Sequence, residues 1–192
     1  MDAWLGLCPP TANTGLRMRD NGVCLVGEDG ILLAISEERL SRYKHDNQVG
    51  RGLEYVSSYS RRNKYTIRSA TLSSCSDAPW SAKAVDITDI PTRLCPSHHY
   101  SHALSAFLAS PFTEALIFVA DAGGNSLHRE ETSTWWAAPR EQTTLWYGIN
   151  GTVVLLERHH AAAFDIGYGE WYRAFTYYLG WPSHTLSGNT MA

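Results

Sequence analysis

Two histidines stand four residues apart in the segment HHYSHA, which begins at residue 98. If this segment is helical, His98 and His102 share one face of the helix, with their Cβ atoms about 6 Å apart. Two neutral imidazoles in that arrangement can hold one divalent cation and leave coordination positions for carboxylates and a ligand. A helix that carries two exposed polar histidines explains the same spacing. The pattern alone therefore leaves both interpretations open.

A carboxylate at the end of an apolar run strengthens the metal hypothesis. Asp121 follows residues 115–120 (ALIFVA), which are typical of a strand buried on both faces. Open α/β sheets place ligand-contacting groups at such strand ends. Gly123 and Gly124 would let the backbone approach a phosphate or a metal-bound ligand closely. An aspartate that merely begins a turn is the alternative. On the metal hypothesis, Asp121 and the two histidines would form an incomplete but sensible ligand set for iron or zinc.

A third group of polar residues follows an expected hairpin. In the segment SEERLSRYKHD, residues 36–46, the cations Arg39, Arg42 and Lys44 alternate with carboxylates. Arginine forks and a lysine point charge could bind an anionic substrate there. A solvated loop whose ion pairs contribute little energy is the other interpretation.

The composition indicates a globular protein. Hydrophobic residues make up 44% and charged residues 18% of the 192 residues, and the net charge is −3. No basic run is long enough to follow a phosphate backbone, and no apolar run approaches the roughly 20 residues of a membrane helix. We therefore expect no nucleic-acid or membrane partner. Four widely spaced cysteines and the absence of a signal peptide favour reduced thiols and a cytoplasmic location.

The periodicity predicts a mixed α/β fold. A β-hairpin is expected around the Asp29-Gly30 turn, and Ser97 is a good N-cap for the helix that bears the histidines. The expected strands cover residues 23–27, 31–35, 65–72, 85–87, 115–120, 134–138, 143–149 and 152–157, and the expected helices cover residues 53–62, 98–108 and 171–179.

Several blocks together resemble the carbamoyltransferase family of nodulation-factor, tobramycin and cephamycin biosynthesis. The blocks are DGILLAISEERLSRYKHD (29–46), HHYSHALSAFLASPFTEALIFVADAGG (98–124), YRAFTYYLGW (172–181) and SGNTMA (187–192). They follow the family's order and extend over nearly the whole chain. The middle block is the most specific, because it joins the histidine pair to the aspartate-ended strand at a fixed distance.

The resemblance implies a Kae1-like domain, an actin-like ATPase fold of two ribonuclease-H-like lobes. In the family, a YrdC-like domain makes carbamoyladenylate from carbamoyl phosphate and ATP. The Kae1-like domain then transfers the carbamoyl group to a hydroxyl of a secondary metabolite or glycan. A second candidate is a non-catalytic remnant that binds metal, nucleotide or a partner, and a third is a related tRNA-modifying protein.

The resemblance also implies roles for individual residues. His98, His102 and Asp121 would hold a divalent metal, Fe²⁺ foremost, with Zn²⁺ or Mn²⁺ as alternatives. Lys44 matches the family lysine expected to contact the carbamoyl or phosphate group. His99 would act as proton acceptor or, more in keeping with its place beside the ligands, as a partner that orients them.

This sequence departs from the family pattern at several positions. Arg19-Asp20 stands where many members have His-Asp, and Asn125 and Asn189 replace a common glutamate and lysine. We expect residues 1–192 to be the amino-terminal part of the Kae1-like domain, without the second lobe, the later metal aspartate or the YrdC-like domain. On that expectation, the chain alone would not transfer carbamoyl groups.

Overall fold

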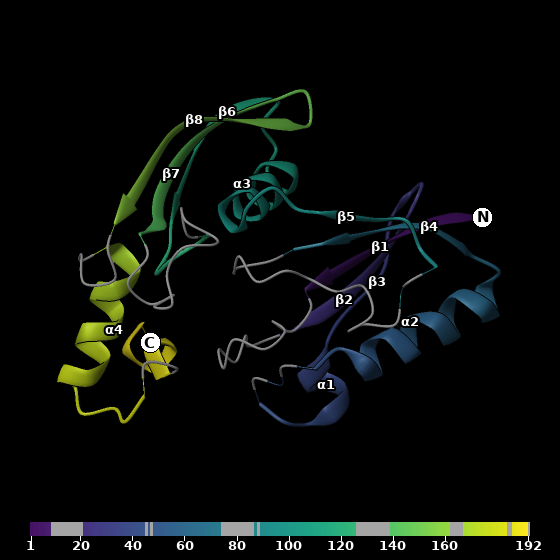
Figure 1. Cartoon of the computed structure of the whole chain (residues 1–192), viewed down its shortest axis with the longest axis horizontal. Helices are drawn as coiled ribbons and strands as arrows, with labels where there is room; N and C mark the ends of the chain where they lie inside the picture. The colour runs from purple at the N-terminus through teal and green to yellow at the C-terminus, as the bar shows by residue number, and fades with distance from the viewer. Residues whose placement is uncertain are drawn as a thin grey trace. The chain divides into compact units, whose positions relative to one another are not determined.

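The computed structural model divides the chain into two compact units, Met1–Pro96 and Ser97–Ala192 (Figure 1). The structure describes residues 1–8, 21–44, 46, 48–73, 87, 89–125, 139–161, 167–183 and 186–191.

The first unit is built on a five-stranded sheet with the order β3-β2-β1-β4-β5. Its strands are β1 (Asp2–Cys8), β2 (Gly22–Gly27), β3 (Gly30–Ser36), β4 (Thr66–Leu72) and β5 (Thr92–Leu94). The first three form an antiparallel meander, and β4 then pairs with β1 in parallel. The predicted hairpin is confirmed, and it turns at Gly30, whose φ of +129° suits glycine alone.

The core of the first unit lies between this sheet and α2 (Gly50–Asn63). Leu5, Leu25 and Val56 are each no more than 2% exposed. In the middle of the sheet Gly6 stands opposite Cys24, and a Cβ at Gly6 would lie 2.4 Å from the Cys24 sulfur. Any larger residue at position 6 would therefore force the Cys24 side chain to move.

Helix α1 (Glu37–Ser41) begins with a glutamate whose buried carboxylate contacts the start of α2. Glu37 is 2% exposed, and its two oxygens accept the backbone N–H groups of Arg51 at 3.1 Å and Gly52 at 2.9 Å. These amides belong to the first turn of α2, where no intrahelical acceptor exists and negative charge is favoured. The first glutamates of the predicted anion-binding block thus begin a short helix, and Glu37 caps the next one.

The second unit contains a three-stranded antiparallel sheet with the order β6-β7-β8. Its strands are β6 (Glu114–Ala120), β7 (Arg140–Ile149) and β8 (Thr152–Ala161), and α3 (His98–Ala109) packs on one face. Phe107 of α3 lies so close to the sheet that a Cβ at Gly148 would be 2.7 Å from its ring. Ala103, Val119 and Trp146 complete the centre of this small core.

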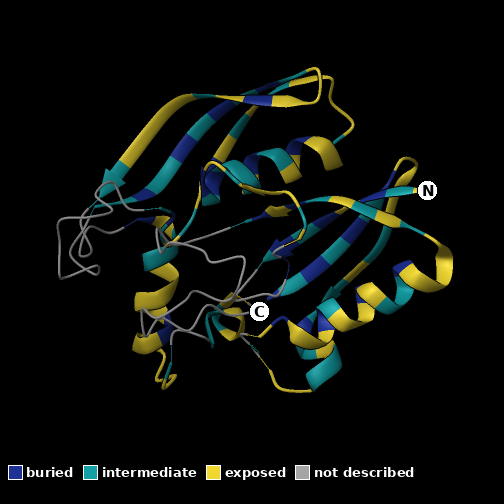
Figure 2. Cartoon of the chain, turned by 45° about the vertical axis from the view of Figure 1, so that its right-hand side comes forward, coloured by how far each residue is buried: buried dark blue, intermediate teal, exposed yellow. Residues whose placement is uncertain are grey.

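The strand expected at residues 115–120 is present, but the expectation that both of its faces are buried is wrong. Among the described strands β6 pairs with β7 alone, and Leu116 and Phe118 are 68% and 61% exposed. Buried and exposed stretches alternate along this sheet in Figure 2. Among the described residues α3 covers one face only, so an apolar sequence is not by itself evidence for two covered faces.

Two helices follow the sheet, α4 (Tyr168–Tyr178) and α5 (Ser187–Met191). Thr176 of α4 is fully buried, donates its hydroxyl to the Tyr172 carbonyl, and lies 2.8 Å from the Thr190 hydroxyl of α5. The opposite side of α4 is aromatic and open to solvent, with Trp171 50% and Tyr178 85% exposed.

The mixed α/β class is confirmed, and the arrangement is compatible with a ribonuclease-H-like or actin-like lobe. The other predicted helices and strands are found with shifted ends. Residues 85–86 and 134–138 lie outside the described residues, and Ile87, the described end of the predicted strand 85–87, is not in a strand. Strands β1 and β5 and helices α1 and α5 were not predicted. No helix in the described part of the chain is long and apolar enough to cross a membrane.

Candidate metal centre

The histidine pair lies at a well-defined helix start. The Ser97 hydroxyl accepts the Tyr100 N–H at 3.1 Å, which confirms the predicted N-cap. The Asn125 side-chain oxygen accepts the His98 N–H at 2.8 Å. Two of the free amides of the first turn are thereby satisfied, and both histidines fall within the first two turns of α3.

The structure brings His98, His102 and Asp121 together. Asp121 Oδ2 lies 2.9 Å from His98 Nε2 and 3.6 Å from His102 Nε2. The two Nε2 atoms are 3.0 Å apart. The geometry that the helical spacing and the strand-end position predicted is therefore present within one unit.

These distances fit one small cation. Metal–ligand bonds of about 2.1 Å place neighbouring ligand atoms about 3.0 to 3.4 Å apart at octahedral or tetrahedral angles. One donor atom from each of the three residues lies within 4.8 Å of the others. Two imidazoles and one carboxylate suit Fe²⁺, Zn²⁺ or Mn²⁺ and leave positions for further ligands. That they hold a metal remains a prediction.

The carboxylate of Asp121 and its histidine neighbours shift one another's pKa values. Burial alone would raise the pKa of Asp121, but hydrogen bonding to His102 and His98 and to the Ala122 amide outweighs it and lowers the pKa far below the usual range. The Asp121 hydrogen bond correspondingly raises the pKa of His102 above its ordinary value. The site thus favours an ionised carboxylate beside positive charge, which a proton or a cation can supply.

His99 points to the core instead of the cluster. Its side chain is fully buried, and Nδ1 lies 3.0 Å from the Thr144 hydroxyl, which also accepts the Trp146 indole N–H at 2.7 Å. Burial lowers the pKa of His99 despite the neighbouring carboxylates. Its Nε2 is buried without a hydrogen-bond partner among the described residues. This burial favours an orienting role over the alternative of a proton acceptor that meets substrate.

A second buried carboxylate supports the loop after Asp121. Glu141 is 1% exposed and lies 2.9 Å from Arg158 Nε. It also accepts the Asn125 N–H at 3.3 Å, while the Gly124 N–H donates to its backbone carbonyl at 2.7 Å. Because Asn125 in turn holds the His98 amide, this network joins the strand-end loop to the start of α3.

The two glycines predicted to bind substrate differ in their surroundings. At Gly124 a Cβ would lie 2.6 Å from a Glu141 oxygen and 2.8 Å from the His99 ring, whereas at Gly123 the nearest atom, in Arg140, would be 3.5 Å away. Close packing therefore requires glycine at position 124. A contact of either glycine with substrate remains a prediction.

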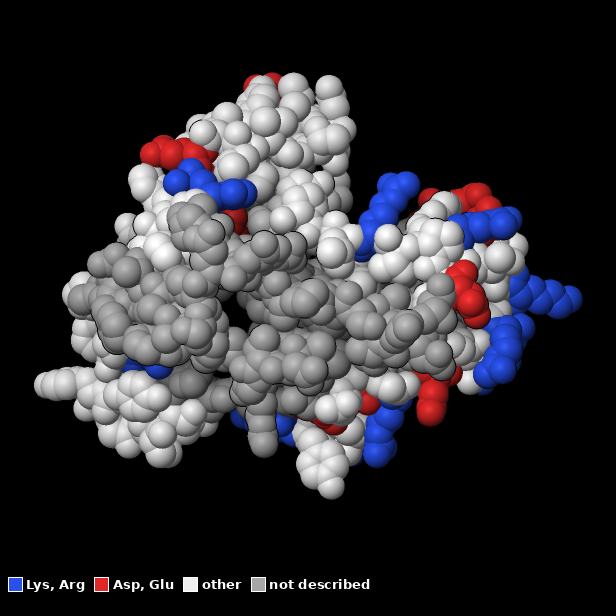
Figure 3. All heavy atoms as spheres, viewed as in Figure 1, with Lys and Arg blue, Asp and Glu red and all other residues white. Residues whose placement is uncertain are grey.

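The predicted cations Arg39, Arg42 and Lys44 belong to the other unit. Arg39 extends into solvent with a long 3.9 Å contact to Glu38, Arg42 ends α1 in the left-handed conformation, and Lys44 is exposed. Figure 3 shows basic and acidic side chains interspersed over the first unit, and a small group of both beside a largely uncharged area over the sheet of the second unit. No contact in the structure tests the substrate roles of the three cations.

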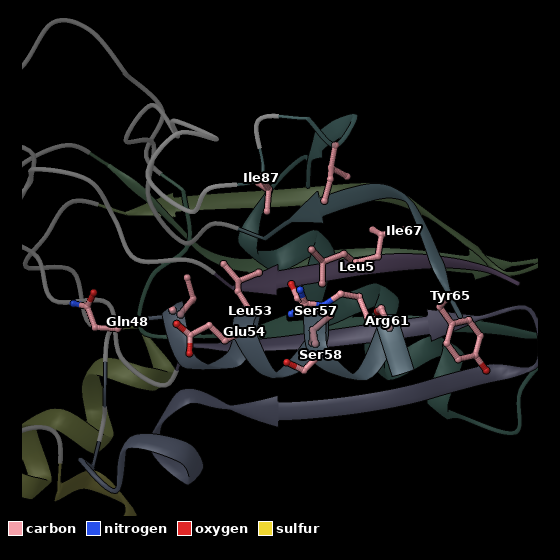
Figure 4. Close-up of a pocket in the computed structure, with 15 residues that line it drawn as sticks. Leu5, Gln48, Leu53, Glu54, Ser57, Ser58, Arg61, Tyr65, Ile67 and Ile87 are labelled. Carbon is pink, nitrogen blue, oxygen red and sulfur yellow. The ribbon is translucent and has the colours of Figure 1, made fainter. Parts of the chain in front are cut away.

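The first unit also contains a hollow of about 1010 Å³ between α2 and the sheet. Figure 4 shows Leu5, Leu53 and Ile67 around it, with Ser57 and Arg61 on the side of α2. None of the predicted site residues is among the described residues that line it.

Sequence reasoning missed three residues that organise these features: Glu37, Asn125 and Glu141. Each has a polar side chain whose partners come from 14 to 27 residues away along the chain. For Asn125, its position directly after the glycine pair was the one feature of the sequence that could have indicated its role.

No family model matches the chain. Over 92 residues, 48% of this chain, it is 38% identical to the uncharacterized protein sll1178 of Synechocystis, and the match covers 12% of that protein. It is also 27% identical to nodulation protein NolNO of Sinorhizobium fredii, in a match that covers 56% of this chain and 20% of that protein. The chain is a distant relative of NolNO and spans a small part of the length of both proteins.

Proposed function

We propose that the second unit holds a divalent cation through His98, His102 and Asp121, and that this site serves O-carbamoyl transfer. The cation is Fe²⁺ in the first place, with Zn²⁺ or Mn²⁺ as alternatives. The carbamoyl donor is carbamoyl phosphate, activated with ATP to carbamoyladenylate, and the acceptor is a hydroxyl of a small molecule or glycan.

The observation that carries the proposal is the convergence of three donor atoms from two elements on one point. The distances suit a cation, and the depressed pKa of Asp121 suits an anionic ligand. The distant similarity to nodulation protein NolNO and the sequence blocks that resemble the carbamoyltransferase family supply the reaction class.

In the proposed transfer, the acceptor oxygen forms a bond to the carbamoyl carbon as the bond from that carbon to the phosphate oxygen breaks. The hydroxyl proton passes to the phosphate group of AMP, which leaves with the bonding electron pair. A bound cation supplies Lewis acidity toward the carbamoyl oxygen. His98 and His102 orient their donor atoms from one helix face, and the buried contact of His99 with Thr144 fixes that helix on the sheet.

The test is anaerobic titration of the full chain with Fe²⁺, and with Co²⁺ as a spectroscopic probe. We expect one cation per chain. Carbamoyl phosphate should then change the visible Co²⁺ spectrum more than the same concentration of inorganic phosphate does. No stoichiometric binding would contradict the cation site. Binding with no response to carbamoyl phosphate would instead favour a cation-binding protein without transfer.

A further inference from the structure

The hollow between α2 and the sheet of the first unit has a floor made by the core. Leu5, Ile67 and Ile87 line it, and Leu5 and Ile87 are only 2% and 5% exposed (Figure 4). A volume of about 1010 Å³ is large enough for a small organic ligand. A ligand in the hollow would therefore contact hydrocarbon on the side of the sheet.

The wall formed by α2 is polar. Glu54, Ser57, Ser58 and Arg61 all line the hollow. Residues three and four apart share one face of a helix, so these four side chains form a single stripe along α2. The lining is thus divided between hydrocarbon from the sheet and charged or hydrogen-bonding groups from the helix.

Arg61 brings a positive charge to this stripe without a partner for it. Among the described residues no carboxylate pairs with its guanidinium, and no described acceptor takes its N–H groups. Glu54 lies about two turns earlier, roughly 10 Å along the helix axis, which is too far for an ion pair. Figure 4 shows Arg61 and Ser57 on the side of α2 toward Leu5, and Glu54 farther along the helix toward Gln48.

We propose that this hollow binds a small organic anion, with a carboxylate or sulfonate at Arg61 and an apolar body over Leu5, Ile67 and Ile87. The planar fork of a guanidinium beside a hydroxyl matches the oxygens of such a head group. A wholly apolar ligand would strip water from Arg61 and Ser57 without replacing it, and a wholly hydrophilic one would gain nothing from the floor. Glu54 repels an anionic head group, so the head group lies at the Arg61 end.

The test uses two fluorescent probes with the same aromatic body on the full chain. Anilinonaphthalene sulfonate carries an anionic group, and N-phenylnaphthylamine is its neutral counterpart. Both should bind the wild-type chain with an increase in fluorescence, because the floor of the hollow serves the shared body.

Arg61→Ala should lower the affinity for the sulfonate probe by about 10-fold, because a charge-assisted hydrogen bond is lost, and should leave the affinity for the neutral probe unchanged. Arg62→Ala is the matched control. It removes the same charge from an exposed position of α2 that does not line the hollow, and it should leave both affinities unchanged.

Ser57→Trp should fill the hollow and weaken the binding of both probes. Tyr55→Trp places the same ring at an exposed position of α2 outside the lining and should weaken neither.

Equal effects of Arg61→Ala and Arg62→Ala on the sulfonate probe would overturn the proposed anion. Undiminished binding of both probes by Ser57→Trp would place them elsewhere on the chain and overturn the site, as would a wild-type chain that binds neither probe.

Discussion

Both units contain an antiparallel meander of three strands, but the first strand of each meander is flanked differently. In the first unit β1 lies between β2 and β4, whereas in the second unit β7 is the one strand among the described residues that pairs with β6. Both second hairpins turn at a glycine with positive φ, Gly30 and Gly151. The same local pattern therefore gives β1 two neighbouring strands and β6 one among the described residues.

The difference extends to the buried polar groups. In the first unit Glu37 satisfies the start of a helix and takes part in no cluster of possible metal ligands among the described residues. In the second unit the ligand cluster lies at the end of β6, and Glu141 supports the loop beside it. What distinguishes the second unit is that the end of β6 meets the start of α3, which brings a carboxylate and two imidazoles together.

The largest effect should come from the ligands themselves. His102→Ala removes one of three donors and Asp121→Asn removes the negative charge of another, and we expect cation affinity to fall by at least about 100-fold in each, as measured by calorimetric titration. Lys44→Ala in the first unit and His159→Ala, an exposed histidine of the second, should bind as wild type does. Unchanged affinity in the ligand variants would place the cation elsewhere.

The two buried carboxylates provide the next test. Glu141→Ala leaves Arg158 unpaired, and Glu37→Ala leaves two amides of α2 unpaired, so each should lower the free energy of unfolding by about 2 to 3 kcal/mol in urea denaturation. Only Glu141→Ala should also weaken cation binding. Equal cation affinities in the two variants would remove the functional distinction between the units.

Crowding at β1 gives a somewhat smaller effect. Gly6→Ala places a methyl group against the Cys24 sulfur and should destabilise the protein by about 1 to 3 kcal/mol in thermal or urea unfolding. The double variant Gly6→Ala/Cys24→Ala should recover much of the loss, because the clashing atom is gone. If the double variant instead loses the sum of the stability losses of the two single variants, the clash is relieved by backbone movement.

The smallest effect should come from the loop that holds the helix start. Asn125→Ala removes the acceptor of the His98 amide and should lower the free energy of unfolding by about 1 kcal/mol and cation affinity by about 10-fold. Asn125→Asp keeps an acceptor oxygen and should retain most of both. If Asn125→Asp behaves like Asn125→Ala in the Co²⁺ spectrum, the hydrogen bond does not orient the ligand.

Much of the fold could be predicted from local patterns. The Asp29-Gly30 turn, the Ser97 N-cap and the histidine spacing depend on chemistry within a few residues, and the structure shows the elements they predict. Strand β1 was missed because apolar and polar residues alternate little along its sequence. The burial of β6 was overestimated because an apolar run does not reveal how many neighbours a strand has.

The candidate site, too, could be predicted in part from local patterns. The sequence by itself determined that His98 and His102 share a helix face and that an aspartate ends a strand, since helical and strand periods are set by the backbone. Only the tertiary structure decided that Asp121 meets both imidazoles, that His99 turns into the core, and that Asn125 and Glu141 hold the loop. Those contacts join residues far apart in the chain, and packing in three dimensions, not local spacing, brings them together.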